Sequence, residues 1–154
     1  MTRLIRDGDR FALWRWQFIE HNGSPYITKL YLARTPLFQL CLHWLHRRDH
    51  DRALHDHPRD FVSIVLRGGY LEERPSTAPS WESVDAADVP ASDTYLVERR
   101  RFSVAFRRAT AAHRIIRVNP GTLTLVFWGP KRREWGFHTP FAGWVHWRRY
   151  LRLP

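Results

Sequence analysis

The feature that most constrains the fold is a succession of short stretches rich in aromatic and β-branched residues, separated by turn-forming residues. Such stretches predict β-strands. The first two, at 11–19 and 26–34, are joined by the turn sequence HNGSP. Further predicted strands lie at 37–47, 61–73, 94–100, 101–108, 112–118, 122–129 and 143–151. Because the strands are short and no stretch has a convincing helical period, we expect an all-β sandwich or barrel.

The length of 154 residues predicts a single domain, 1–154. Apolar residues make up 44% of the chain, enough to build a buried core. Residues 74–93 are rich in Pro, Ser, Ala and Asp, which predicts a long surface loop. The glycine pair at 68–69 predicts a bend within 61–73. Allowing one residue of error in register, the expected core includes Leu40, Leu42, Val62, Ile64, Leu66, Val104, Leu123, Leu125 and Phe127.

The formal net charge is +10, and apart from Lys29 and Lys131 the basic residues are arginines. This charge is compatible with nucleic-acid binding. That function is not favoured, because the basic residues are spread along the chain. The single cysteine, Cys41, excludes an intrachain disulfide and is typical of a reducing compartment. With no apolar stretch of membrane-spanning or signal-peptide length, we expect a cytoplasmic protein without membrane association.

Several common catalytic motifs are absent. The sequence contains no G-x-x-x-x-G-K-[ST], no G-x-G-x-x-G and no G-x-S-x-G. Cys41 lies in the apolar stretch 37–47, where a thiolate nucleophile is disfavoured. The chemistry must therefore come from other residues.

Two histidines, His55 and His57, stand directly before the predicted strand at 61–73. In an extended backbone residues i and i+2 face the same side, so both imidazoles would project together and Asp56 would point away. Two imidazoles on one face can chelate a divalent metal. The best candidate for a third ligand is His113, which follows the 74–93 loop. The alternative is that these histidines bond backbone carbonyls in turns.

These residues resemble the two motifs of the cupin superfamily, whose fold is a double-stranded β-helix of jelly-roll type. The first motif reads H-x-H, three or four residues, Glu, six residues, Gly, and is similar to HDHPRDFVSIVLRG at 55–68. The second, P-x-G-x-x-H, is similar in length to RATAAH at 108–113. The resemblance implies a cupin jelly roll in which His55, His57 and His113 bind one metal ion.

The sequence departs from the first motif at its Glu, where Phe61 or Val62 stands. We expect one of these apolar side chains to pack against the site. A three-histidine set is similar to that of the thiol dioxygenases, cupins that hold Fe(II) without a carboxylate ligand. Over residues 40–150 the chain also resembles small bacterial and phage cupins, a group without a settled activity.

Other polar residues near the motifs are weaker candidates. We predict that His138 lies at the rim, as an acid/base or a partner of a ligand, and that Arg52 anchors a substrate carboxylate. Arg114 should point outward if His113 points inward. Asp49 or Asp51 could accept a hydrogen bond from a ligating imidazole, although a solvated charged loop is the favoured interpretation. Alternation along 37–47 makes His43 a core residue and His46 a surface residue, or the reverse.

The leading functional hypothesis is a metal-dependent oxygenase acting on a small acidic or thiol-bearing molecule. By resemblance the cofactor is one divalent transition metal, with Fe(II) favoured and Zn, Ni and Mn as alternatives. One alternative function is a non-oxidative isomerase or epimerase, which would work without dioxygen. Another is a non-catalytic protein that holds a ligand or nucleic acid. The expected partner is a small-molecule substrate, and a homodimer is compatible with the sequence.

Overall fold

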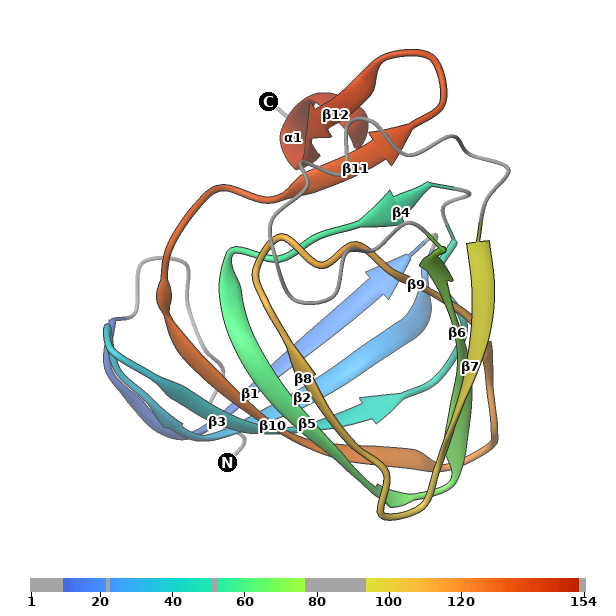
Figure 1. The fold of residues 1–154 in the computed structure, drawn as a ribbon. Coiled ribbons are helices and arrows are strands. Elements are labelled where there is room, and N and C mark those ends of the chain that lie inside the picture. Colours follow the sequence, from blue (N-terminus) through green and yellow to red (C-terminus); the bar gives the residue numbers. More distant parts are fainter. Residues whose placement is uncertain (1–9, 22, 51–52, 77–93, 153–154) are drawn as a thin grey trace.

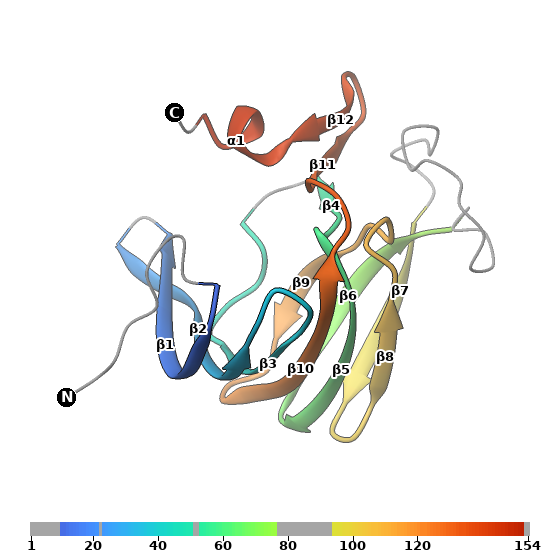
Figure 2. The same ribbon diagram turned by 90° about the vertical axis from the view of Figure 1, so that its left-hand side faces the viewer.

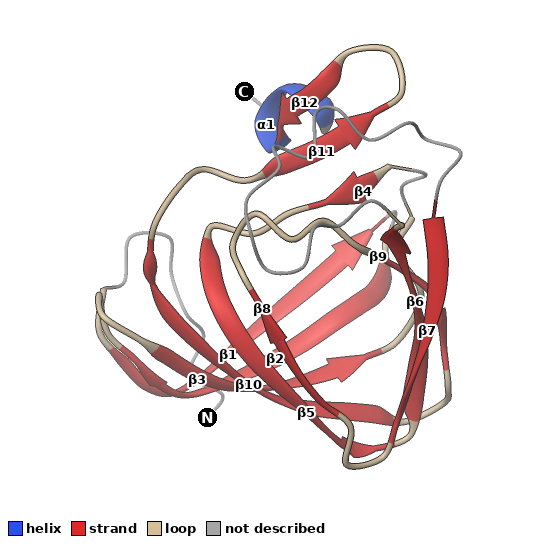
Figure 3. Cartoon of the chain, in the orientation of Figure 1, coloured by secondary structure: helices blue, strands red, loops and turns tan. Residues whose placement is uncertain are grey.

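The computed structural model describes residues 10–21, 23–50, 53–76 and 94–152. Antiparallel strands make up most of this part of the chain (Figures 1 and 3). In chain order the elements are β1 (Ala12–His21), β2 (Ser24–Arg34), β3 (Gln39–Leu45), β4 (Leu54–His55), β5 (Arg59–Arg67), β6 (Gly69–Pro75), β7 (Thr94–Arg100), β8 (Val104–Arg107), β9 (Arg114–Val118), β10 (Thr122–Lys131), β11 (Gly136–Thr139), β12 (Gly143–His146) and α1 (Trp147–Tyr150).

The strands form a jelly roll, as the sequence predicts. A six-stranded sheet has the order β1-β2-β3-β10-β5-β8, and β7-β6-β9 form a second sheet. A third, short sheet, β12-β11-β4, lies across one end, together with α1 (Figures 1 and 2). Because β10 pairs with both β3 and β5, contacts between distant parts of the sequence close the roll.

At the predicted bend, the glycine pair, the chain passes from the six-stranded sheet into the second sheet. Gly68 separates β5 from β6 with φ of 71°, a left-handed conformation that favours glycine. A Cβ on Gly68 would stand 2.8 Å from the Cα of Thr122, so a side chain has no room there. The Thr122 hydroxyl also donates a 2.8 Å hydrogen bond to the carbonyl of Gly69, which fixes the start of β6.

The predicted core is shifted by one residue. The buried residues on these strands include Cys41, Val65 and Val126, each one position away from a predicted core residue. In contrast, Val104 is 61% exposed and Phe127 is 48% exposed. Because neighbouring side chains on a strand point to opposite faces, a shift of one residue exchanges the two faces of the sheet. The apolar residues expected in the core lie instead on the outer face of the six-stranded sheet.

The structure differs from the predicted elements at three further places. The strand expected at 143–151 ends at His146 and is followed by the single helical turn α1. The short strand β11 was not expected. The predicted loop at 74–93 begins later, because β6 continues to Pro75, and positions 77–93 lie outside the described residues. No helix within the described ranges has the length and apolar character needed to cross a membrane.

Candidate metal centre

The fold brings the two histidine segments together by backbone pairing. His55 on β4 forms an isolated bridge with His113, in which each backbone N–H donates to the other residue's carbonyl, at 2.9 and 3.0 Å. The N–H of His57 donates to the carbonyl of Ala109 at 2.9 Å. Backbone hydrogen bonds at both histidines therefore hold the H-x-H segment against the chain from Ala109 to His113.

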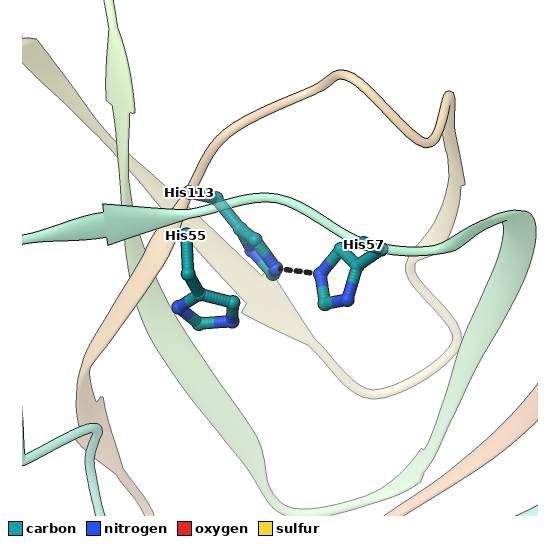
Figure 4. A group of neighbouring side chains, drawn as sticks. All are labelled: His55, His57 and His113. Atoms are coloured by element: carbon teal, nitrogen blue, oxygen red, sulfur yellow. Dashed lines mark hydrogen bonds between the residues drawn. The ribbon is translucent and has the colours of Figure 1, made fainter. Parts of the chain in front are cut away.

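The three imidazoles converge on one point (Figure 4). One ligand nitrogen from each of His55, His57 and His113 lies within 4.8 Å of the others, and the Nε2 atoms of His57 and His113 are 2.8 Å apart. A first-row divalent metal binds imidazole nitrogen at about 2.0–2.1 Å. Ring nitrogens at this separation can hold one such ion between them, so the residues fit a metal.

The protonation state of the site also suits a metal. Burial lowers the pKa of His55 to about 4, although the nearby Asp49 carboxylate raises it. Burial, followed by the neighbouring His113 and His55, holds the pKa of His57 well below its usual value. Both imidazoles are therefore neutral at pH 7, which is the form that binds metal.

A buried carboxylate, which the sequence analysis did not single out, fixes the ring of His113. The His113 Nδ1–H donates to Glu72 Oε2 at 3.2 Å, which leaves Nε2 to face the other histidines. Glu72 lies on β6 and accepts hydrogen bonds from the guanidinium groups of Arg99 and Arg107. Burial acts to raise the pKa of Glu72, but the His113 hydrogen bond and the adjacent positive charges outweigh it and lower the pKa to about 2.

A second carboxylate, Asp49, lies behind His55 but does not bond to it. Its Oδ2 is 3.7 Å from His55 Nδ1, beyond hydrogen-bond range. Asp49 instead accepts hydrogen bonds from the Tyr26 hydroxyl and from the backbone N–H of Ile115, the latter at 2.6 Å. The favoured interpretation of Asp49 as part of a solvated loop is therefore wrong, because its carboxylate ties the loop to β2 and β9. Asp51 lies outside the described residues.

Aromatic side chains line the site. The ring of Phe61 lies 4.9 Å from that of His57, and Trp128 lies 5.4 Å from His57 and 4.4 Å from Phe61. Phe137 lies 6.0 Å from His55. Phe61 therefore packs against the site, as predicted, at the motif position of the cupin Glu.

The structure does not bring His138 into this group. His138 follows Phe137 on β11, and because Phe137 faces His55, His138 points to the other side of that strand. Its Nε2 lies 3.3 Å from Oδ2 of Asp56. The proposed anchor Arg52 lies outside the described residues. Arg114 points away from the site and pairs with Glu73, as alternation predicts.

Asp56, between the two histidines, has a structural role. It is fully buried and accepts a hydrogen bond from the backbone N–H of Gly136 at 2.7 Å and from the Trp144 indole at 2.9 Å. An Arg133 guanidinium nitrogen lies 3.2 Å from the same carboxylate. These contacts fasten the H-x-H segment to the β11–β12 hairpin and so hold the imidazoles in place.

A basic side chain, Lys29, shares the inner face of the roll with the site. Lys29 pairs in register with His43 of β3 and Gln17 of β1. Burial lowers the pKa of Lys29, and its charge in turn contributes to the lowered pKa values of His43 and His57. Among the described residues no carboxylate forms an ion pair with Lys29. The sequence did not indicate it, because its position depends on the pairing of three strands.

Cys41 and His43 form a buried pair on the same face. The Sγ of Cys41 lies 3.0 Å from His43 Nε2, and burial raises the pKa of the thiol to about 11. Cys41 is therefore a neutral thiol at pH 7, in agreement with the argument against a cysteine nucleophile. His46, by contrast, is exposed and bonds to the Thr28 hydroxyl, so alternation does separate the two histidines.

Comparison with known proteins identifies the fold. No family model and no curated protein matches the sequence. Among solved structures, KdgF from Halomonas sp. is 18% identical with a TM-score of 0.50, over 85% of this chain and 96% of that one. Fe(II)-HppE with the alternative substrate (S)-1-HPP is 13% identical with a TM-score of 0.52. The hydroxypropylphosphonic acid epoxidase from S. wedmorenis is 13% identical with a TM-score of 0.51.

The chain has the cupin fold. The matches to Fe(II)-HppE and to the epoxidase cover 82% and 81% of this chain but only 59% and 61% of theirs. At these identities the shared property is the cupin fold itself. The three-histidine group occurs within that fold and could bind a metal.

Proposed function

We propose that this protein is a metal-dependent oxygenase that acts on a small acidic or thiol-bearing molecule. The observation that carries the proposal is the group of His55, His57 and His113, with Phe61 where the cupin motif has a carboxylate ligand. Three imidazole ligands leave coordination positions open for other ligands. Fe(II), the favoured ion, would supply the redox chemistry for a reaction of substrate with dioxygen when bound there.

The surrounding residues of the chain would prepare the site. Glu72 holds His113 in the tautomer whose Nε2 faces the other histidines. The rings of Phe61 and Trp128 cover the side of His57 and would exclude water from the substrate. Such an arrangement protects a reactive centre from side reactions.

An acidic substrate fits the charge on the inner face. Lys29 is the candidate anchor, because its ammonium group faces the interior and has no carboxylate partner among the described residues. An ammonium group in such surroundings favours an anion that neutralises it. Arg52 remains a proposed second anchor. Two solved structures with this fold, those of Fe(II)-HppE and of a hydroxypropylphosphonic acid epoxidase, support iron and an acidic substrate as the first choices to test.

Metal analysis tests the site. Wild type and the variants His55→Ala, His57→Ala and His113→Ala are purified without added chelator, loaded with Fe(II) under anaerobic conditions, and analysed for bound metal. We expect about one ion per wild-type chain and a loss of roughly tenfold or more in each variant. The matched control is His46→Ala, an exposed histidine outside the group, which should keep its metal. Equal metal content in all five proteins would refute the site.

Oxygen uptake tests the reaction. The Fe(II)-loaded protein is incubated with a panel of small carboxylates, phosphonates and thiols, and dioxygen consumption is followed together with product analysis. Lys29→Gln should raise the KM for the acidic substrate while leaving metal content unchanged, whereas Lys131→Gln, which removes an exposed lysine, should alter neither. Turnover that persists without dioxygen would support an isomerase or epimerase instead. Tight binding without turnover under either condition would support a ligand-binding protein.

A further inference from the structure

The outer face of the six-stranded sheet is apolar at most of its aligned positions. The strand register aligns one residue from each strand into a row across the sheet: Trp16, Leu30, Leu42, Leu125, Ile64 and Val104. We call this row and the aligned row on each side of it the outer sheet face. Phe127 and Phe106 belong to one flanking row, and Phe18 and Trp44 to the other. In this second flanking row Thr28 is polar, and Arg67, which pairs with Leu123 at the end of β5, is charged. The other two rows carry no charged residue.

Much of this face is open to solvent in the single chain. Val104 and Phe106 are both 61% exposed, Phe18 is 55% exposed and Phe127 is 48% exposed. Trp16 stacks with Phe18, and its ring lies 5.5 Å from that of Trp44, so these three aromatic side chains form a connected group. Contiguous apolar patches of this kind are uncommon on monomeric proteins and mark contact surfaces.

The size of the face suits a stable protein contact. Six strands side by side and three rows of alternate residues cover about 30 by 20 Å, a flat footprint of roughly 600 Å². Protruding side chains add to the accessible area. A standard interface hides about 800 Å² on each partner. The flat footprint is below that value, and the protruding side chains bring the accessible area of the outer sheet face closer to what a stable dimer needs.

We propose that the outer sheet face is the contact between two copies of this chain. Charge favours a second copy over a nucleic acid or an acidic protein. Each chain carries a formal charge of +10, so two copies can approach closely only where like charges are few. Two of the three rows carry no charge, and the third carries only Arg67 at its end. An acidic partner would be bound through the arginines, which apart from Arg67 lie outside these rows. A flat sheet face is also self-complementary about a twofold axis, with the two sheets about 10 Å apart.

Sedimentation velocity tests the contact. Wild type should sediment as a dimer at micromolar concentrations. Phe127→Glu places a charge within the outer sheet face at a half-exposed position, so the chain should fold but its dimer dissociation constant should rise by roughly a hundredfold. Phe141→Glu is the matched control, because Phe141 is 100% exposed in the turn between β11 and β12, away from this sheet. It should remain dimeric.

Three outcomes would overturn the proposal: a monomeric wild type, a dimeric Phe127→Glu, or a Phe141→Glu chain that dissociates to the same extent. Circular dichroism checks that each variant is folded. Should Phe127→Glu fail to fold, Phe106→Glu on the edge strand β8 applies the same test at a 61% exposed position. A monomeric wild type that binds vesicles of phosphatidylcholine and phosphatidylglycerol through this face would assign the surface to membranes and refute the dimer.

Discussion

The two faces of the six-stranded sheet differ in an unusual way, because polar side chains are buried beside the apolar core on one face and apolar side chains are exposed on the other. The inner face buries polar side chains, among them His43, Ser63, Thr124 and Arg107. The outer face exposes apolar ones, such as Phe127. Closure of the roll, rather than hydrophobicity alone, decides which face of the sheet is buried.

This difference shows that the two faces must meet different requirements to be stable. Buried polar groups are tolerated when they have partners, and the inner groups have them: Arg107 pairs with Glu72, and His43 contacts Cys41. Such an interior can support binding and catalysis next to the histidine group. An exposed apolar face has no comparable compensation within one chain, which is the reason to look for a second copy.

The largest expected effect comes from breaking the ion cluster on the inner side. Glu72→Gln removes the charge that compensates Arg99 and Arg107, and leaves two largely buried guanidinium groups without an anion. We expect the free energy of unfolding to fall by about 3–5 kcal/mol, measured by urea denaturation. The control is Glu98→Gln, whose partner Arg100 is exposed, and which should cost less than about 1 kcal/mol. Equal losses would mean that the cluster adds no stability beyond that of a surface pair.

The next effect is the response of the metal-free protein to acid. The folded pKa of His55 is about 4, below the value of about 6.5 for an unfolded chain. Between these two values the unfolded state binds more protons, so stability falls as the pH is lowered from about 6.5 to 4. The loss from His55 alone should be about 3 kcal/mol. His57 should add to it, because its pKa is also lowered.

Denaturation at a series of pH values measures this loss, with His55→Ala as the comparison. Removing the imidazole should flatten the slope between pH 4 and 6.5. An unchanged slope would show that His55 titrates in the folded protein as it does in the unfolded chain.

The smallest expected effect is the loss of folding stability when a valine on either face of the sheet is replaced by alanine. Val65, on the inner face, is 1% exposed, and Val104, on the outer face, is 61% exposed. Val65→Ala should lower stability by about 2 kcal/mol through lost burial and a cavity. Val104→Ala should change the folding stability of the monomer by less than about 0.5 kcal/mol. Both are read from thermal or urea unfolding of monomeric protein, and similar losses would contradict the assignment of inner and outer faces.

Much of the candidate site was predictable because its signals are local. The spacing of His55 and His57 requires only an extended backbone. The position of His113 after the long loop made it the candidate third ligand, and the similarity to the cupin motifs supported it and placed Phe61 beside the three histidines. The supporting residues were not predictable in this way. Glu72 meets His113 across 41 positions of sequence, and Lys29 reaches the inner face through the pairing of β1, β2 and β3.

The sequence by itself determined the strands, the change of direction at Gly68 and the histidine pair, because each depends on neighbours a few residues away. The tertiary structure alone decided which face of each strand is buried. Both faces of strands such as β5 carry apolar residues, so the pattern permits either register. The choice is made when β10 inserts between β3 and β5 and the roll closes, since closure fixes the side that loses contact with water.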